Sequence, residues 1–104
     1  MMRGMGNMQG MMKQVQKMQK EMTVAKAALD EKIFEGEAGN GLVKVVMTGA
    51  KQVTDIKINP DVLDPEDAEM VQDLVMVATN QVLANIDAET EKVMGKYANT
   101  IPGL

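Results

Sequence analysis

The chain has 104 residues, which fits a single domain over residues 1–104, and its formal net charge is −4. It contains no Cys, His, Ser or Trp. These absences exclude disulfides, thiolate metal sites and the Ser–His and Cys–His pairs of nucleophilic enzymes. We therefore expect a cytoplasmic protein that is not an enzyme and uses no cofactor.

The net charge conceals an uneven distribution of charged side chains. Residues 1–32 carry six basic side chains against three acidic ones, whereas residues 33–104 carry five against twelve. A basic segment can bind nucleic acid even in a chain of negative overall charge. No apolar run approaches the roughly 18 residues of a membrane span, and glycines interrupt the N-terminus where a signal peptide would be apolar, so we expect no membrane partner.

Residues 11–32 show the pattern of a long amphipathic helix. Apolar side chains recur at alternating spacings of four and three residues, which is typical of a helix that packs along another helix. They are Met11, Val15, Met18, Met22, Ala25 and Leu29. At about 100° per residue, Lys13, Lys17 and Lys20 fall together on the opposite face. Three glycines disfavour helix in residues 1–10, so we expect order to begin near Met11.

Both faces of this helix allow two interpretations. We call the apolar series from Met11 to Leu29 the methionine seam. It is either a packing surface or an adaptable groove for an apolar helix of another protein, because Met is flexible and fits irregular partners. We call Lys13, Lys17 and Lys20 the lysine ridge. This face of the helix is either simply solvated or binds anions. Only one acidic residue, Glu21, precedes Asp30 in the chain, which favours anion binding.

Three antiparallel strands are predicted next. Residues 34–38 form the first, and the turn Gly39–Asn40–Gly41 supplies residues that accept positive φ. Residues 42–47 carry apolar side chains on both faces, which is typical of a central strand. Residues 52–58 alternate as a half-buried strand does, and Pro60 prevents its continuation.

A second long helix is predicted from Pro65 to Tyr97, with Asp64 as its N-cap. Its apolar face is broad as far as Ile86 and thinner beyond, and residues 98–104 form a tail. Acidic residues crowd the start of this helix, where they complement its dipole. They lack the spacing of a Ca²⁺ loop, so no metal site is predicted. They are Asp61, Asp64, Glu66, Asp67, Glu69 and Asp73.

The predicted helices are too long for the predicted body. At 1.5 Å per residue the second helix spans about 50 Å and the first about 33 Å, whereas a compact chain of this size has a radius of gyration near ~13 Å. Either the second helix breaks near Ile86–Asp87, or its end projects and pairs with the first helix. A twofold dimer joined at the sheets, with projecting arms, would cover the remaining apolar surface.

Several stretches resemble the YbaB/EbfC family of bacterial nucleoid-associated DNA-binding proteins. They are residues 11–19, 39–45, 56–60 and 63–67, with Met70 and Leu74, and the resemblance spans nearly the whole chain. It implies an α+β fold of the order α-β-β-β-α, with a three-stranded antiparallel sheet and long N- and C-terminal helices. It also implies a tweezer-like homodimer that binds double-stranded DNA in the nucleoid and regulates genes.

The resemblance places the DNA contacts on the projecting helices. The corresponding residues are Lys13, Lys17, Lys20, Lys92, Lys96 and Arg3. Each would displace counterions from a phosphate, which is a sequence-independent contribution. No small-molecule substrate is implied. The alternative interpretation is a Met-rich protein-interaction module or accessory factor that does not itself bind DNA.

Overall fold

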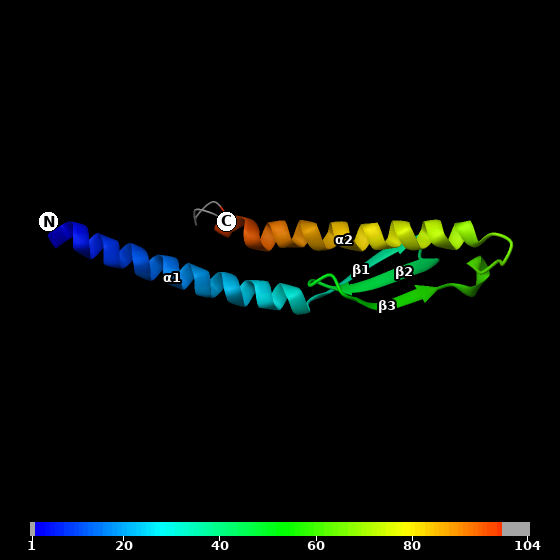
Figure 1. The fold of residues 1–104 in the computed structure, drawn as a ribbon, viewed down its shortest axis with the longest axis horizontal. Helices are drawn as coiled ribbons and strands as arrows, with labels where there is room; N and C mark the ends of the chain where they lie inside the picture. Colours follow the sequence, from blue (N-terminus) through cyan, green and yellow to red (C-terminus); the bar gives the residue numbers. More distant parts are fainter. Residues whose placement is uncertain (1, 99–104) are drawn as a thin grey trace.

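The computed structural model describes residues 2–98, with side chains described for residues 8–97. Its elements follow one another as helix, three strands, a short 3-10 helix and helix (Figure 1). They are α1 (Met2–Glu31), β1 (Ile33–Ala38), β2 (Val43–Thr48), β3 (Val53–Ile58), η1 (Pro60–Val62) and α2 (Ala68–Ala98). The predicted α-β-β-β-α fold is confirmed. The molecule is 79 Å long but only 18 by 17 Å across.

The three strands form one antiparallel sheet in the order β1-β2-β3. The predicted central position of the second strand is thus confirmed. The β1–β2 turn contains three successive residues with positive φ, namely Gly39 at 62°, Asn40 at 57° and Gly41 at 88°. Glycine and asparagine adopt this left-handed conformation at the lowest cost, so the local sequence specifies the hairpin.

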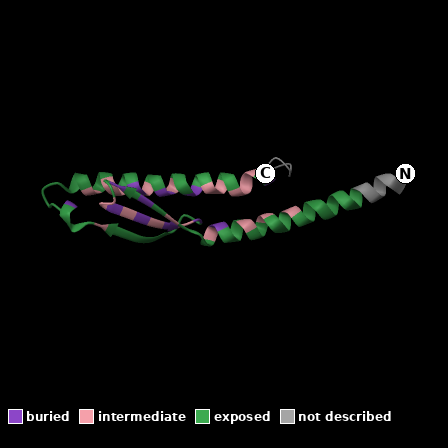
Figure 2. Cartoon of the chain, turned by 180° about the vertical axis from the view of Figure 1, so that it is seen from behind, coloured by how far each residue is buried: buried purple, intermediate pink, exposed green. Residues whose placement is uncertain are grey.

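The core lies between α2 and the first two strands. α2 covers one face of β1 and β2 and buries an apolar row along its length (Figure 2). The fully or nearly fully buried side chains are Ala38, Val43, Val45, Met47, Ala78, Val82 and Ile86. Contact is closest at Gly36, where a Cβ atom would lie 2.3 Å from the carbonyl oxygen of Ala78. The absence of a side chain at Gly36 therefore lets the helix approach the sheet.

The third strand is more exposed than its alternating sequence predicts. Five of its six residues are exposed and only Ile58 is half-buried, so the expectation of a half-buried strand is wrong for the single chain. The reason is that α2 lies over β1 and β2 and leaves β3 uncovered. Ile56 pairs with the buried Val45 and shares its face of the sheet, yet it remains 47% exposed.

The two edges of the sheet differ in their hydrogen bonding. At the β1 edge, the backbone N–H of Glu37 donates to the side-chain oxygen of Gln81 at 2.6 Å, and the Asn85 amide donates to the carbonyl of Glu35 at 3.1 Å. Side chains of α2 thus occupy the β1 edge. Within the described residues, no comparable side chain covers the β3 edge, which leaves backbone groups open to another strand.

Both long helices begin elsewhere than expected. α1 begins at Met2 rather than near Met11, because the cost of each glycine, about 1 kcal/mol relative to Ala, is spread among residues that favour helix. α2 begins at Ala68 rather than at Pro65. The Asp64 carboxylate accepts a hydrogen bond from the N–H of Glu66 at 2.9 Å, so it closes a turn before the helix and does not cap α2.

The end of α2 leaves the sheet and lies beside α1 (Figure 1). α2 continues without a break through Ile86 and Asp87. Of the two arrangements expected from the sequence, a broken helix or a projecting helix end, the structure has the projecting end. Leu29 of α1 lines a pocket together with Glu89 and Val93 of α2, and it is 4% exposed. We call α1 together with residues 87–98 the arm, and the sheet with the rest of α2 the body. Within residues 2–98, no helix combines the length and apolarity needed to cross a membrane.

Replacing Gly36 with Ala should loosen the body. The added methyl group meets the Ala78 carbonyl, so α2 has to shift, and we expect a loss of about 1–3 kcal/mol in the free energy of unfolding, measured with urea. Gly95→Ala is the matched control, because a Cβ atom there meets nothing within 4 Å and should stabilise the helix by up to about 1 kcal/mol. Equal stability of the two variants would contradict the close approach.

Candidate nucleic-acid interface

The predicted lysines lie on the surface of the arm. Lys13, Lys17 and Lys20 are exposed on α1, and Lys92 and Lys96 are exposed near the end of α2. The structure therefore brings these five residues onto one projecting element. The sixth predicted residue, arginine 3, belongs to α1, but its side chain lies outside the described residues.

Lysines nearer the body are already paired with carboxylates. The ion pairs are Lys26–Asp30, Lys32–Glu89 at 3.0 Å, Lys44–Glu35 at 3.7 Å and Lys51–Asp87 at 3.2 Å. Among the side chains of residues 8–97, Lys13, Lys17, Lys20 and Lys92 make no ion pair, and neither does Lys57 on β3. Four of these five cations lie on the arm, where each is available to replace a counterion of a phosphate.

The turn between β2 and β3 holds the base of α1. The backbone N–H of Ala50 donates to the carbonyl of Asp30 at 3.3 Å, and that of Gly49 donates to the carbonyl of Lys32 at 2.9 Å. The last carbonyls of a helix lack partners within the helix, so these bonds satisfy groups that would otherwise be unpaired. A Cβ atom at Gly49 would lie 1.8 Å from the Leu29 carbonyl oxygen, so the turn and α1 fit only because that residue is glycine.

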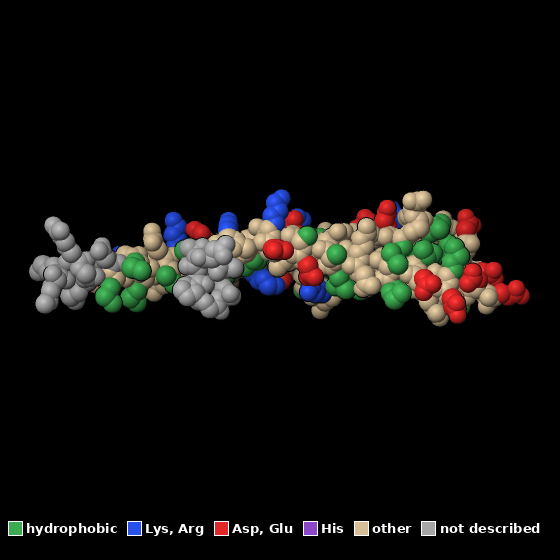
Figure 3. All heavy atoms as spheres, turned by 90° about the horizontal axis from the view of Figure 1, so that it is seen from above, with side chains coloured by type: hydrophobic (Ala, Val, Ile, Leu, Met, Phe, Trp, Pro, Cys, Tyr) green, Lys and Arg blue, Asp and Glu red, His purple; other side chains and the backbone are tan. Residues whose placement is uncertain are grey.

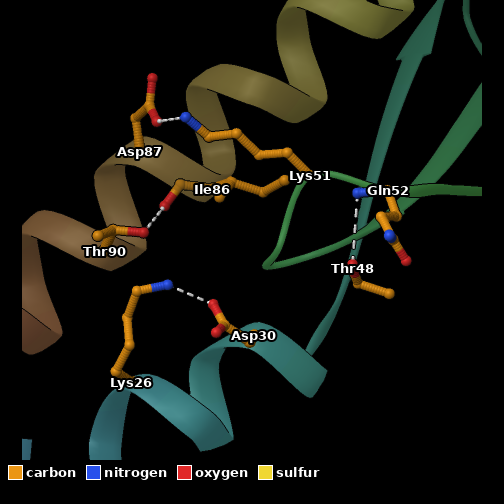
Figure 4. A network of polar contacts seen from close by, with 8 residues as sticks. All are labelled: Lys26, Asp30, Thr48, Lys51, Gln52, Ile86, Asp87 and Thr90. Carbon is orange, nitrogen blue, oxygen red and sulfur yellow. Dashed lines mark hydrogen bonds and ion pairs between the residues drawn. The ribbon is translucent and has the colours of Figure 1, made fainter. Parts of the chain in front are cut away.

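Ion pairs also connect α2 to the turn and to the end of α1. We call this region, where the arm leaves the sheet, the base of the arm. Lys51, in the same turn, reaches Asp87, and Lys32, just after α1, reaches Glu89 (Figure 4 shows the first pair). These partners are far apart in the sequence, and no local pattern marks them. Reasoning from the sequence therefore missed both contacts. Together with the backbone bonds of the turn, they fix the direction in which the arm leaves the sheet.

Neither aromatic ring offers a platform for stacking nucleic-acid bases. Tyr97 is buried, and the ammonium group of Lys96 lies 5.1 Å from its ring centre. Phe34 is half-buried in β1, with the Lys32 ammonium 5.5 Å from its ring centre. Proteins that bind single strands stack bases on exposed aromatic rings, and neither Phe34 nor Tyr97 presents such a surface.

Acidic residues cover the end of the molecule farthest from the free end of α1, and others lie along the middle of the molecule (Figure 3). Those around η1 and the start of α2 are all exposed, and they include Asp61, Asp64, Glu66 and Asp67. Among the described residues, no group of His, Cys, Asp or Glu side chains is arranged to hold a metal ion. The outer part of α1, which carries Lys13, Lys17 and Lys20, and the acidic start of α2 thus lie toward opposite ends of the long axis (Figure 1).

A family model described as the YbaB/EbfC DNA-binding family matches residues 5–101. The chain belongs to the YbaB/EbfC DNA-binding family. Two similar proteins, both named nucleoid-associated protein, come from Enterococcus faecalis and Listeria monocytogenes serotype 4a. The first is 59% identical over 104 residues and covers 100% of each chain. The second is 57% identical over 105 residues and covers 99% of this chain and 100% of its own.

The fold also matches a solved structure. A crystal structure of an uncharacterized protein from Helicobacter pylori superposes with a TM-score of 0.66 at 23% identity, covering 80% of this chain and 96% of that one. At this identity the match shows the fold alone. The predicted family membership and fold are therefore both confirmed, by independent comparisons of sequence and of structure.

The contact between Lys32 and Glu89 makes the base of the arm sensitive to acid. The hydrogen bond from Lys32 and its positive charge lower the pKa of Glu89, and Lys92 adds to this effect, while burial opposes it. A carboxylate whose pKa is lower in the folded state stabilises the fold above its unfolded pKa. That contribution is lost as the pH falls through the folded pKa.

An NMR titration of the side-chain carboxyl carbons tests this contact. In the unaltered protein, Glu89 should titrate below its ordinary value of 4.5, and Lys32→Gln should raise its pKa toward that value. Lys20→Gln removes one charge elsewhere on the arm and should leave the Glu89 titration unchanged. A Glu89 pKa that does not respond to Lys32→Gln would contradict the assigned pair.

Proposed function

We propose that the protein binds double-stranded DNA as a homodimer through the basic residues of its projecting arms, within the cytoplasmic nucleoid. The proposal is supported most by the four lysines of the arm that make no ion pair, Lys13, Lys17, Lys20 and Lys92, since four of the five lysines nearer the body are paired with carboxylates. Membership of a DNA-binding family and relatives named nucleoid-associated proteins support the same role. The binding would alter DNA conformation and thereby gene expression.

The proposed contact is made with phosphates. Lys13, Lys17 and Lys20 lie on one face of a straight helix, and each would displace one counterion from the DNA backbone. Lys92, Lys96 and Arg3 would add to this set. Such contacts carry no base information, so any sequence preference would come from the shape or deformability of the DNA. The acidic end of the body would be repelled by the duplex, which would orient the arm toward it.

Homodimerisation is proposed through β3. Its edge is open whereas α2 side chains occupy the β1 edge, and Val53 and Ile56 are 49% and 47% exposed on it. An exposed edge strand with apolar side chains is a surface that natural proteins normally cover. A second copy would cover it and would leave both arms projecting, which doubles the number of lysines that one molecule presents to DNA.

Neutralising the lysine ridge should reduce both affinity and salt dependence. The triple variant Lys13→Gln, Lys17→Gln and Lys20→Gln removes up to three phosphate contacts per arm, each worth about −0.9 in the slope of log K against log salt. Fluorescence anisotropy with a labelled duplex at several salt concentrations measures that slope. We expect a slope less steep by about 3 for one engaged arm.

The matched control removes the same charge from the body. Lys44→Gln, Gln72→Glu and Asn80→Glu together lower the net charge of the body by the same three units without touching the base of the arm or β3, and they should leave the slope nearly unchanged. If both triple variants lowered affinity equally, overall charge rather than the arm would govern binding, and the proposed interface would be wrong.

Placing a charge on β3 should separate the dimer. Ile56→Glu puts a carboxylate on the strand that we propose to be covered, and burying it unpaired would cost several kcal/mol. Light scattering should then give the 11.3 kDa mass of one chain instead of twice that mass. Val24→Glu, at an apolar position on the arm that is 65% exposed, should leave the dimer intact. A dimer that survives Ile56→Glu would rule out β3 as its interface.

A further inference from the structure

The outer part of α1 carries an apolar face that α2 does not reach. The seam is covered where the two helices run together, since Leu29 is buried and Met18 and Met22 are half-buried. Within residues 2–98, α1 continues past the end of α2 with no other helix or strand beside it (Figure 1). There Met8, Met11 and Met12 are 65%, 64% and 61% exposed, and Val15 is 40% exposed. We call residues 8–16 the arm tip.

The exposed side chains of the arm tip form one continuous surface. Met8, Met11, Met12 and Val15, with Gln16, border an open hollow of about 370 Å³. They continue the same helical seam that α2 covers farther along. A surface of flexible thioether side chains adapts readily to another apolar helix. The hollow is thus the uncovered end of a helix-packing surface.

The charges around the arm tip favour a second copy of the same helix. The residues flanking the seam, Gln14, Gln16 and Gln19, are uncharged. The lysines lie on the opposite face of the helix, and the first acidic residue of the chain is Glu21. Two identical tips can therefore meet along the seam without bringing like charges together, which is the usual obstacle to self-association of a basic helix.

We propose that the arm tips of two different molecules pair antiparallel through this surface. A twofold contact places Met8 of one tip beside Val15 of the other and brings Met11 close to Met12 near the axis. The antiparallel arrangement also opposes the two helix dipoles, whereas a parallel one would align them. The tips lie far from β3, so the pairing is separate from the proposed dimer interface.

The contact between two arm tips is weak in free molecules and becomes stronger when DNA holds the molecules close together. Four apolar side chains per copy bury much less than the roughly 1,200–2,000 Å² of a stable interface, so isolated contacts are transient. Molecules held on DNA meet at a higher effective concentration, which strengthens the contact without adding area. If the arms bind DNA as proposed above, the lysine ridges of paired tips face outward to two duplex segments, and the pair bridges them.

Single-cysteine cross-linking tests the pairing without DNA. The chain has no Cys, so each introduced thiol is unique. Met8→Cys and Val15→Cys proteins, mixed and oxidised at high concentration, should give mainly 8–15 disulfides if the tips are antiparallel. Links of 8 to 8 and 15 to 15 would show parallel arms and would overturn the proposal. Val24→Cys, on the same helix but off the seam and 65% exposed, sets the background level of chance links.

Sedimentation of the protein alone gives a second readout. The unaltered protein should self-associate beyond its basal state as concentration rises, and Met11→Glu should weaken that step by about tenfold or more by placing two like charges near the axis. Val24→Glu should not weaken it. Circular dichroism should show equal helix content in both variants. No association in the unaltered protein, or equal loss in both variants, would overturn the pairing.

Two further outcomes separate this inference from its alternatives. A variant ending at residue 98 tests whether residues 99–104 of the same chain cover the tip. If association appears only after their removal, the chain's own tail is the occupant and the proposal is wrong. Pairing that persists in the triple lysine-to-glutamine variant, whose affinity for DNA is expected to be reduced, would show that the two proposals succeed or fail separately.

Discussion

The architecture depends on a mismatch in length between the helices and the sheet. Strands of six residues span about 20 Å, whereas the 31 residues of α2 span about 46 Å. The sheet can bury only the first part of α2, up to about Ile86. The remainder extends beyond the body and lies beside α1, which leaves the same end of the sheet. The arm is thus a direct consequence of element lengths.

The molecule is divided into a body that contains the apolar core and an arm that carries exposed lysines. The body derives its stability from an apolar core and holds Lys44 and Lys51 in ion pairs, while the arm is a narrow helical pair on which Lys13, Lys17, Lys20 and Lys92 make no ion pair. Substitutions among the arm lysines therefore change no core contact. The base of the arm is the exception, because Lys32 and Lys51 fix its direction through Glu89 and Asp87.

Features set by local sequence could be predicted, and features set by distant contacts could not. The Gly39–Asn40–Gly41 turn needs positive φ, and the lysine ridge follows from helical period, so both were predictable. The exposure of β3 depends on where α2 crosses the sheet, which no strand pattern encodes. Asp64 precedes Pro65 as an N-cap would, but its carboxylate is engaged by Glu66, so the start of α2 was misplaced. The DNA-contacting role of the lysines remains a prediction.

Methionine methyl groups report on the central claim, that the arm is the surface that meets DNA. They occur on both parts of the molecule, including Met18 and Met22 on the arm and Met47 and Met70 in the body. In a ¹³C-methyl NMR titration with duplex DNA, the arm methyl signals should shift or broaden while the body signals stay in place. Shifts confined to the body methyls, with the arm signals unchanged, would contradict the account.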